Sequence, residues 1–178
     1  MPISPRHQQC ACGLDRRGFL LAGGAALAGA LSFSATAALP QQAYEALLLI
    51  CSEPPVWQQA NNYLRTRNLA GKYQPVEVTG GAIGLVAEQY QASREAFWEQ
   101  VMSAAAWQQT KKVIALNHRG CAATKVAYGL AKLSDKLLET ETHRYALQEF
   151  RKQVAERNPA LDVEIGLIGL DGKVQMFK

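Results

Sequence analysis

The sequence predicts an α/β protein: a single domain with a parallel-dominated central sheet, flanking helices and an antiparallel edge strand. Short apolar runs typical of buried strands alternate with longer segments of helical periodicity, which is the pattern of parallel sheets with helical crossovers. Asp171 and Gly172 form a two-residue hairpin signal between the apolar run 161–170 and the last segment, 173–177. Residues 38–178 show no internal repeat and have the length of one domain.

The first half of the predicted domain contains two strands separated by a helix. The apolar run 46–50 predicts a buried strand. Segment 56–70 has apolar residues at helical spacing and is followed by Gly71, a residue suited to a helix C-terminus. The alternating segment 75–79 predicts a shorter strand. A glycine-rich stretch over 80–84 follows, and on its own it reads as a flexible turn.

The second half contains two long helices around a central strand. Ser93 is expected to cap a helix that runs to about Gln109. Its tryptophans, Trp98 and Trp107, are expected to make contacts in the core or between subunits. The apolar run 113–116 predicts the central strand, and a polar turn leads from it into a helix of small residues.

The last long helix is expected to begin at Thr142 and to end before Pro159, with a buried apolar stripe along its length. This start places His143 in the first turn. A histidine in that position is more often a surface or capping residue than a metal ligand or proton shuttle, so the surface interpretation is favoured.

Residues 1–37 have the features of a twin-arginine signal peptide. Arg16 and Arg17 precede an apolar stretch to Phe33, and the small residues 35–37 fit a cleavage site. We therefore expect export by the twin-arginine machinery, cleavage and a periplasmic location. The alternative is an uncleaved anchor, although the stretch is shorter than the roughly 18 residues that a spanning helix needs.

Removal of this segment changes the charge and the cysteine count. It takes three arginines and one aspartate from the formal +4, which leaves +2. This small charge, without a basic patch containing aromatic residues, argues against nucleic-acid binding, and no stable membrane span is expected after cleavage. Cys51 and Cys121 remain of four cysteines, and His118 and His143 of three histidines.

Cys51, His118 and Cys121 are the candidates for a metal site. Cys51 follows the first apolar run, and the other two follow the central one. If these strands are parallel neighbours, their carboxyl ends meet at one edge, where open α/β sheets bind ligands. Zinc accepts imidazole nitrogen and thiolate sulfur, and three protein ligands leave one position open. The alternative is a disulfide in an oxidising compartment, although a disulfide has no use for a histidine three residues before a cysteine.

These residues resemble the β-class carbonic anhydrases, and more narrowly a divergent bacterial branch of carbonic anhydrase-like proteins. The family carries Cys-x-Asp-x-Arg after its first strand and His-x-x-Cys-Gly after its third. Here CSEPP stands at 51–55 and HRGCA at 118–122. The branch is also similar at 128–129 (YG) and 169–172 (GLDG). The resemblance covers residues 46–177.

The resemblance implies Zn²⁺ held by Cys51, His118 and Cys121. It also implies reversible hydration of CO2 to bicarbonate by zinc-bound hydroxide, because zinc lowers the pKa of its water to about 7. Similar proteins place a glycine-rich loop near the metal, so Gly81 and Ala82 are candidate contacts for this small substrate. Because β-class enzymes are typically dimers or larger, a homodimer is expected.

Three residues depart from the family pattern: Glu53 replaces the aspartate, Pro55 the arginine and Ala122 the glycine. In the family, the arginine holds the aspartate, which contacts zinc-bound water or the zinc. Glu53 is therefore the candidate catalytic carboxylate, as a group that orients water, carries protons or closes the zinc site. With the arginine lost, the alternative is a non-catalytic zinc-binding pseudo-enzyme. The third interpretation is a disulfide-stapled domain without metal.

Overall fold

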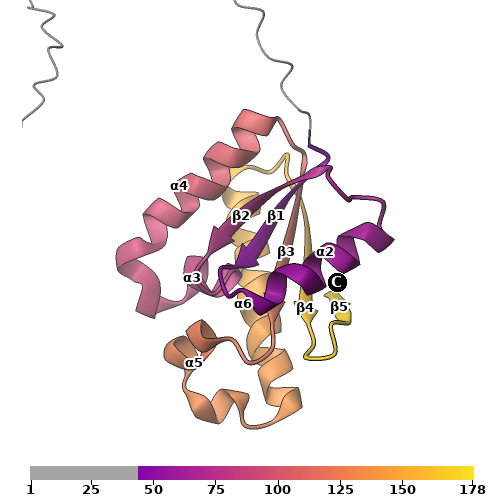
Figure 1. The fold of residues 1–178 in the computed structure, drawn as a ribbon. Coiled ribbons are helices and arrows are strands. Elements are labelled where there is room, and N and C mark those ends of the chain that lie inside the picture. The colour runs from indigo at the N-terminus through magenta and orange to yellow at the C-terminus, as the bar shows by residue number, and fades with distance from the viewer. Residues whose placement is uncertain (1–43) are drawn as a thin grey trace, which may run out of the picture. The chain divides into compact units, whose positions relative to one another are not determined.

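A computed structural model describes residues 44–178, which form one α/β domain around a five-stranded sheet (Figure 1). The strand order is β2-β1-β3-β4-β5. The first four strands are parallel, and β5 pairs antiparallel with β4. The strands are β1 (Ala46–Cys51), β2 (Tyr73–Val78), β3 (Lys112–His118), β4 (Asp162–Ile168) and β5 (Val174–Phe177). The predicted fold class is confirmed, including the antiparallel edge strand after the hairpin.

Helices cover both faces of the sheet. The α-helices are α2 (Pro55–Thr66), α3 (Ala82–Val86), α4 (Gln91–Gln108), α5 (Ala122–Tyr128) and α6 (Lys136–Arg157). Two short 3-10 helices, η1 (Glu88–Tyr90) and η2 (Leu130–Leu133), lie between them in sequence. The apolar side of α2 packs on one face, and α3, α4 and α6 pack on the other. Figure 1 places α5 and the first turns of α6 beyond the carboxyl ends of β1 and β3.

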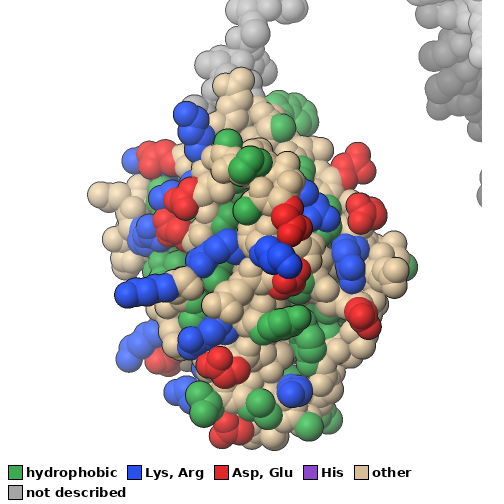
Figure 2. Space-filling model, turned by 180° about the vertical axis from the view of Figure 1, so that it is seen from behind, with side chains coloured by type: hydrophobic (Ala, Val, Ile, Leu, Met, Phe, Trp, Pro, Cys, Tyr) green, Lys and Arg blue, Asp and Glu red, His purple; other side chains and the backbone are tan. Residues whose placement is uncertain are grey.

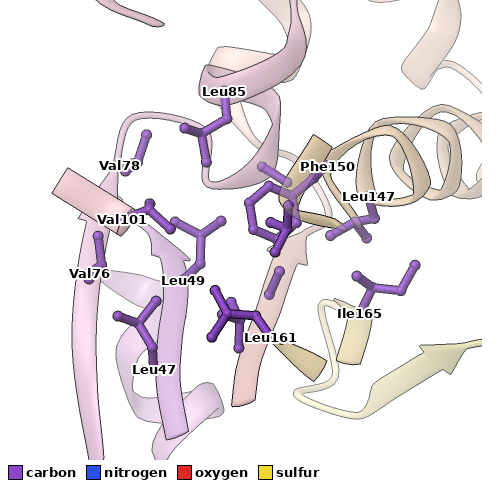
Figure 3. Packing of buried hydrophobic residues seen from close by; sticks show 14 of the residues in the cluster. Leu47, Leu49, Val76, Val78, Leu85, Val101, Leu147, Phe150, Leu161 and Ile165 are labelled. Atoms are coloured by element: carbon purple, nitrogen blue, oxygen red, sulfur yellow. The ribbon is translucent and has the colours of Figure 1, made fainter. Parts of the chain in front are cut away.

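The central strand β1 is buried along its whole length, which explains its continuous apolar sequence. Leu47 and Leu49 point toward α4 and α6, where they join the cluster that contains Phe150 (Figure 3). Leu48 and Ile50 point to the opposite face, toward α2. Because both faces are covered, β1 needs apolar residues at every position rather than at alternate ones.

Two predicted helix starts are wrong. Helix α4 begins at Gln91, ahead of Ser93. Helix α6 begins at Lys136, six residues before Thr142, because the Asp135 carboxylate accepts hydrogen bonds from the backbone N–H groups of residues 137 and 138. A carboxylate at this position satisfies N–H groups that the helix itself leaves unpaired. Thr142 instead donates its hydroxyl proton to the carbonyl of Leu138 within the helix.

Only one of the two tryptophans has the predicted place in the core. Trp98 is buried and stacks on Phe150, with ring centroids 5.5 Å apart, which confirms its place in the core. Trp107 is 75% exposed, so it is not a core residue. It is the next-to-last residue of α4, and its other predicted role, a contact between subunits, stays a prediction.

The predicted signal peptide at residues 1–37 lies outside the described residues. Within 44–178, no helix has the length and hydrophobicity to cross a membrane. Figure 2 shows side chains of both charge signs interspersed over one face of the molecule.

Glu164 on β4 should give the fold a measurable pH dependence. Its carboxylate forms ion pairs with Arg67 and with Lys112, the latter at 2.8 Å. The hydrogen bond from Arg67, helped by Lys112 and opposed by burial, lowers the pKa of Glu164 to about 2. The unfolded pKa is about 4.3, so this stabilisation is present above that pH and is lost as pH falls toward 2.

We therefore expect Glu164→Gln to lower the free energy of unfolding by about 1 kcal/mol at pH 7. The difference from wild type should shrink as pH falls from about 4.5 toward 2. Urea unfolding at a series of pH values measures this, with Asp162→Asn on the same strand as an exposed control. A difference that does not change with pH would show that lost packing, rather than the ion pairs, causes the effect.

Candidate metal centre

Two neighbouring parallel strands bring four side chains together. The register pairs Leu47 with Val113 and Ile50 with Leu116, so β1 and β3 end side by side. Cys51 is the last residue of β1, and His118 is the last residue of β3. The predicted convergence of Cys51, His118 and Cys121 is present, and Glu53 joins them. One ligand atom from each lies within 4.8 Å of the others.

The spacing of these atoms is slightly wider than that of the ligand atoms in a tetrahedral metal site. The Sγ atoms of Cys51 and Cys121 lie 4.0 Å apart. Glu53 Oε1 lies 3.9 Å from Cys51 Sγ and 3.8 Å from His118 Nε2. Zinc bonds of 2.0–2.3 Å in tetrahedral geometry separate ligand atoms by roughly 3.3–3.8 Å. Small inward movements would therefore bring all four atoms to bonding distance of one ion.

The tautomer of His118 suits a metal ligand. Its Nδ1 lies 3.0 Å from the carbonyl oxygen of Arg119, so Nδ1 carries the proton and donates it. Nε2 then presents its lone pair, and it is buried with no hydrogen-bond partner among residues 44–178. Metal-binding histidines commonly donate the other ring N–H to a carbonyl in this way. A buried nitrogen without a partner, facing two thiols, fits a nitrogen- and sulfur-binding ion.

The charges at the site also favour a cation. Both cysteines are buried free thiols, and the hydrogen bond between them lowers the pKa of Cys121 to about 3 and raises that of Cys51. Burial acts to lower the pKa of His118, but the nearby Cys121 sulfur, the charge of Glu53 and the carbonyl of Arg119 raise it overall. The same negative charges that retain protons here would attract a metal ion in their place.

Backbone N–H groups around the two cysteines act to lower the pKa of both thiols. Hydrogen bonds from the backbone of Glu53 and Gly80 act to lower the pKa of Cys51. A backbone hydrogen bond from Thr124 acts in the same direction on Cys121. Such donors stabilise sulfur in the thiolate form, which is the form that binds metals.

Glu53 is held by the backbone in place of an arginine. Its Oε1 accepts a hydrogen bond of 2.9 Å from the backbone N–H of Ala122, the first residue of α5. The side chain is 34% exposed, whereas those of both cysteines and His118 are buried. Glu53 therefore connects the buried ligand atoms with solvent. Sequence motifs could not reveal this anchor, because a backbone N–H group is common to every residue except proline.

The glycine-rich stretch lies directly beside the site. Gly80 and Gly81 have φ angles of +78° and +57°, which non-glycine residues rarely adopt. A Cβ on Gly81 would lie 3.4 Å from the backbone nitrogen of Cys51. Ala82 is buried and starts α3, and its N–H already donates to Asn117. Substrate contact with Gly81 and Ala82 stays a prediction.

Helix α6 supplies partners for the turn between His118 and Cys121, and the sequence did not reveal these partners. The Glu139 carboxylate accepts hydrogen bonds of 2.8 Å from Arg119 and from the backbone N–H of Gly120. His143 is fully buried and lies 3.3 Å from the side-chain amide of Asn117, so its predicted surface position is wrong. The misplaced helix start hid both residues, because a start at Thr142 excludes Glu139 from the helix.

Comparisons of the sequence identify relatives whose names assign no activity. No family model matches the chain. It is 29% identical over 131 residues to an uncharacterised protein of Rickettsia bellii, covering 74% of this chain and 80% of that protein. An uncharacterised protein of Rickettsia conorii is 26% identical, covering 74% of this chain and 70% of its own length.

Comparisons of the structure identify β-carbonic anhydrases. The β-carbonic anhydrase CcaA matches with a TM-score of 0.51 and 14% identity, covering 77% of this chain and 81% of that one. CafA, a β-carbonic anhydrase of Aspergillus fumigatus, also has a TM-score of 0.51, with 16% identity and coverage of 77% and 76%. The chain therefore has a β-carbonic anhydrase-like fold, with a Cys/Glu/His/Cys cluster at the carboxyl ends of its central strands.

Proposed function

We propose that the protein binds Zn²⁺ through Cys51, His118 and Cys121 and catalyses the reversible hydration of CO2 to bicarbonate. The observation that carries this proposal is the convergence of the three side chains with Glu53 within 4.8 Å, in a chain whose structural neighbours are β-carbonic anhydrases. Zinc suits this donor set, and when bound it lowers the pKa of a water molecule to about 7.

Glu53 is the residue that we assign to proton transfer. Its carboxylate lies between the buried ligand atoms and solvent, so a proton taken up there has a short path out. The hydrogen bond from the N–H of Ala122 holds Oε1 close to Cys51 and His118. A backbone donor in a fixed position restricts the carboxylate without requiring the missing arginine, which favours a preorganised site.

A second candidate function is a closed zinc site in a non-catalytic protein. The observation that favours it is the position of Glu53 Oε1, which has the spacing of a fourth ligand. Zinc sites with four protein ligands are typically structural. The two candidates share the same metal and the same three ligands, and they differ in whether Glu53 leaves the fourth position open to water.

The testing experiment is zinc analysis, thiol titration and a CO2 hydration assay on one sample of the full-length gene product. About one zinc per chain, with both thiols protected until zinc is chelated and with measurable hydration, supports the proposal. Zinc without hydration would favour the closed site. No zinc together with no free thiol would overturn the metal site and favour the disulfide.

Location and assembly complete the proposal. We propose export by the twin-arginine machinery on the basis of Arg16 and Arg17, and a homodimer on the basis of the family resemblance. Cell fractionation and the mass of the mature chain test the first. Light scattering of the purified protein tests the second, and a monomer at micromolar concentration would contradict it.

The anchoring of Glu53 by Ala122 gives a specific prediction. Proline is tolerated at the first position of a helix, and Cys121, with φ −59° and ψ 126°, already has the conformation that a following proline requires. Ala122→Pro therefore keeps the backbone conformation but removes the N–H that donates to Glu53, and the proline ring takes the place next to the nitrogen where Oε1 lies. Since a hydrogen bond to a charged group contributes about 1.5–3 kcal/mol, we expect hydration to fall roughly 10- to 100-fold with zinc retained.

The matched control is Ala122→Gly, which keeps the N–H and should keep most of the activity. Hydration rates and zinc content are measured side by side for both variants. If Ala122→Pro retains zinc and full activity, the backbone N–H is not what positions Glu53.

A further inference from the structure

Asn117 is a buried amide in the strand that carries His118. It is 1% exposed and precedes His118 in β3, so the two side chains point to opposite faces of the sheet. His118 faces the ligand cluster, whereas Asn117 faces α3 and α6, where it contacts Ala82 and His143. A buried amide at this point needs partners for both its oxygen and its nitrogen.

Both partners are present, and they determine the orientation of the amide. The backbone N–H of Ala82 can only donate, so the atom 3.1 Å from it is Oδ1 of Asn117. The Nδ2 group then donates to Nδ1 of His143, 3.3 Å away. His143 must therefore accept at Nδ1, which requires the neutral ring with its proton on Nε2. Burial agrees with this state, because it lowers the pKa of His143 to about 4.

Ala82 ends the glycine turn that contacts Cys51. Gly80 supplies a backbone hydrogen bond to the Cys51 sulfur. A Cβ on Gly81 would lie 2.9 Å from Asn117 Oδ1 and 3.4 Å from the Cys51 nitrogen. The turn therefore fits closely between the end of β1 and the Asn117 amide. Movement of Ala82 away from Asn117 would also move the Gly80 N–H relative to the sulfur.

We infer that Asn117 and His143 form a positioning pair that holds the glycine turn 80–82 against Cys51. His143 fixes the Asn117 amide, the amide holds Ala82, and the turn keeps its N–H donor on the Cys51 sulfur. The consequence for zinc affinity rests on the proposed function. The contact between the pair and the turn does not depend on a metal.

The test uses two substitutions that separate hydrogen bonding from packing. In His143→Asn, Oδ1 occupies the same place along the side chain as Nδ1 of histidine, so the acceptor for Asn117 is kept although volume is lost. His143→Leu fills more of the space but has no acceptor. Leu147→Ala, one turn further along the same face of α6 and fully buried, is the control for lost stability alone.

Hydrogen exchange of the Ala82 amide in the reduced, zinc-free protein measures the pair directly. Without an acceptor at position 143, the Asn117 amide turns to other partners and releases Ala82. Loss of one hydrogen bond of about 1 kcal/mol corresponds to roughly fivefold faster exchange. We expect this acceleration in His143→Leu and nearly wild-type exchange in His143→Asn and in Leu147→Ala.

Zinc affinity, measured by chelator competition, is the second readout. Loss of a partner behind the ligands typically costs 10- to 100-fold in metal affinity, so we expect that loss for His143→Leu and recovery in His143→Asn. The absorption spectrum of the cobalt-substituted protein should shift in His143→Leu and stay close to wild type in His143→Asn. Equal exchange rates and equal zinc affinities in His143→Leu and His143→Asn would overturn the inference. It would also be overturned if exchange and affinity changed in proportion to melting temperature across all three variants, including Leu147→Ala. A wild-type protein that binds no zinc would overturn the proposed function, and amide exchange would still decide the positioning pair.

Discussion

Replacing His118 with alanine is expected to remove zinc from the protein. The substitution deletes the only imidazole in the Cys/Glu/His/Cys cluster, and the Nε2 atom that it removes is buried without a hydrogen-bond partner among residues 44–178. Loss of a direct ligand should cost more than the roughly 100-fold that loss of an outer partner can cost. Zinc content after dialysis and melting temperature with and without chelator measure the effect. The wild-type melting temperature should fall on chelation, and that of His118→Ala should not change.

The control for His118→Ala is Leu116→Ala. Leu116 lies two residues earlier on the same face of β3 and is fully buried, so its loss should cost about 2–5 kcal/mol of stability. It contributes no ligand atom, so the folded variant should keep its zinc. One zinc per chain in His118→Ala would contradict the metal assignment. Unchanged stability together with an absence of free thiols would point to the disulfide.

The fold and the convergence of the candidate metal ligands could be predicted because they depend on simple patterns. Strands 46–50 and 113–116 are continuous apolar runs, since both faces of the sheet are covered. Once these runs are taken as parallel neighbours, Cys51 and His118 must meet at one edge. Residue identity and spacing were enough for this step, because the chemistry that distinguishes a metal site lies in the side chains themselves.

The supporting contacts could not be predicted, for two different physical reasons. The N–H of Ala122 that replaces the arginine belongs to the backbone, so no residue type signals it. The buried His143 and its contact with Asn117 depend on where α6 begins. Asp135 and Thr142 are both acceptable cap residues, and only tertiary packing, which places Glu139 against Gly120, decides between them.

Replacing Glu53 with glutamine is expected to abolish most CO2 hydration while the fold and the zinc content stay nearly unchanged. Glutamine keeps an oxygen that can accept the N–H of Ala122, so the side chain should retain its place. It cannot take up a proton at neutral pH. Since loss of a positioned proton-transfer group typically costs 10²- to 10⁴-fold, we expect a loss of about 100-fold or more in the hydration rate.

Zinc content separates the two roles of Glu53 that the geometry allows. If Glu53 is chiefly a proton acceptor, Glu53→Gln loses hydration with its zinc in place, and exposed Glu77→Gln on β2 behaves as wild type. If Glu53 is instead a permanent fourth ligand, the wild type does not hydrate CO2, and the substitution weakens zinc, because a neutral amide is a poorer zinc ligand than a carboxylate. Full activity in Glu53→Gln would contradict the proposed role of this residue. The proton would then have to leave by another route, since the remaining members of the cluster are buried.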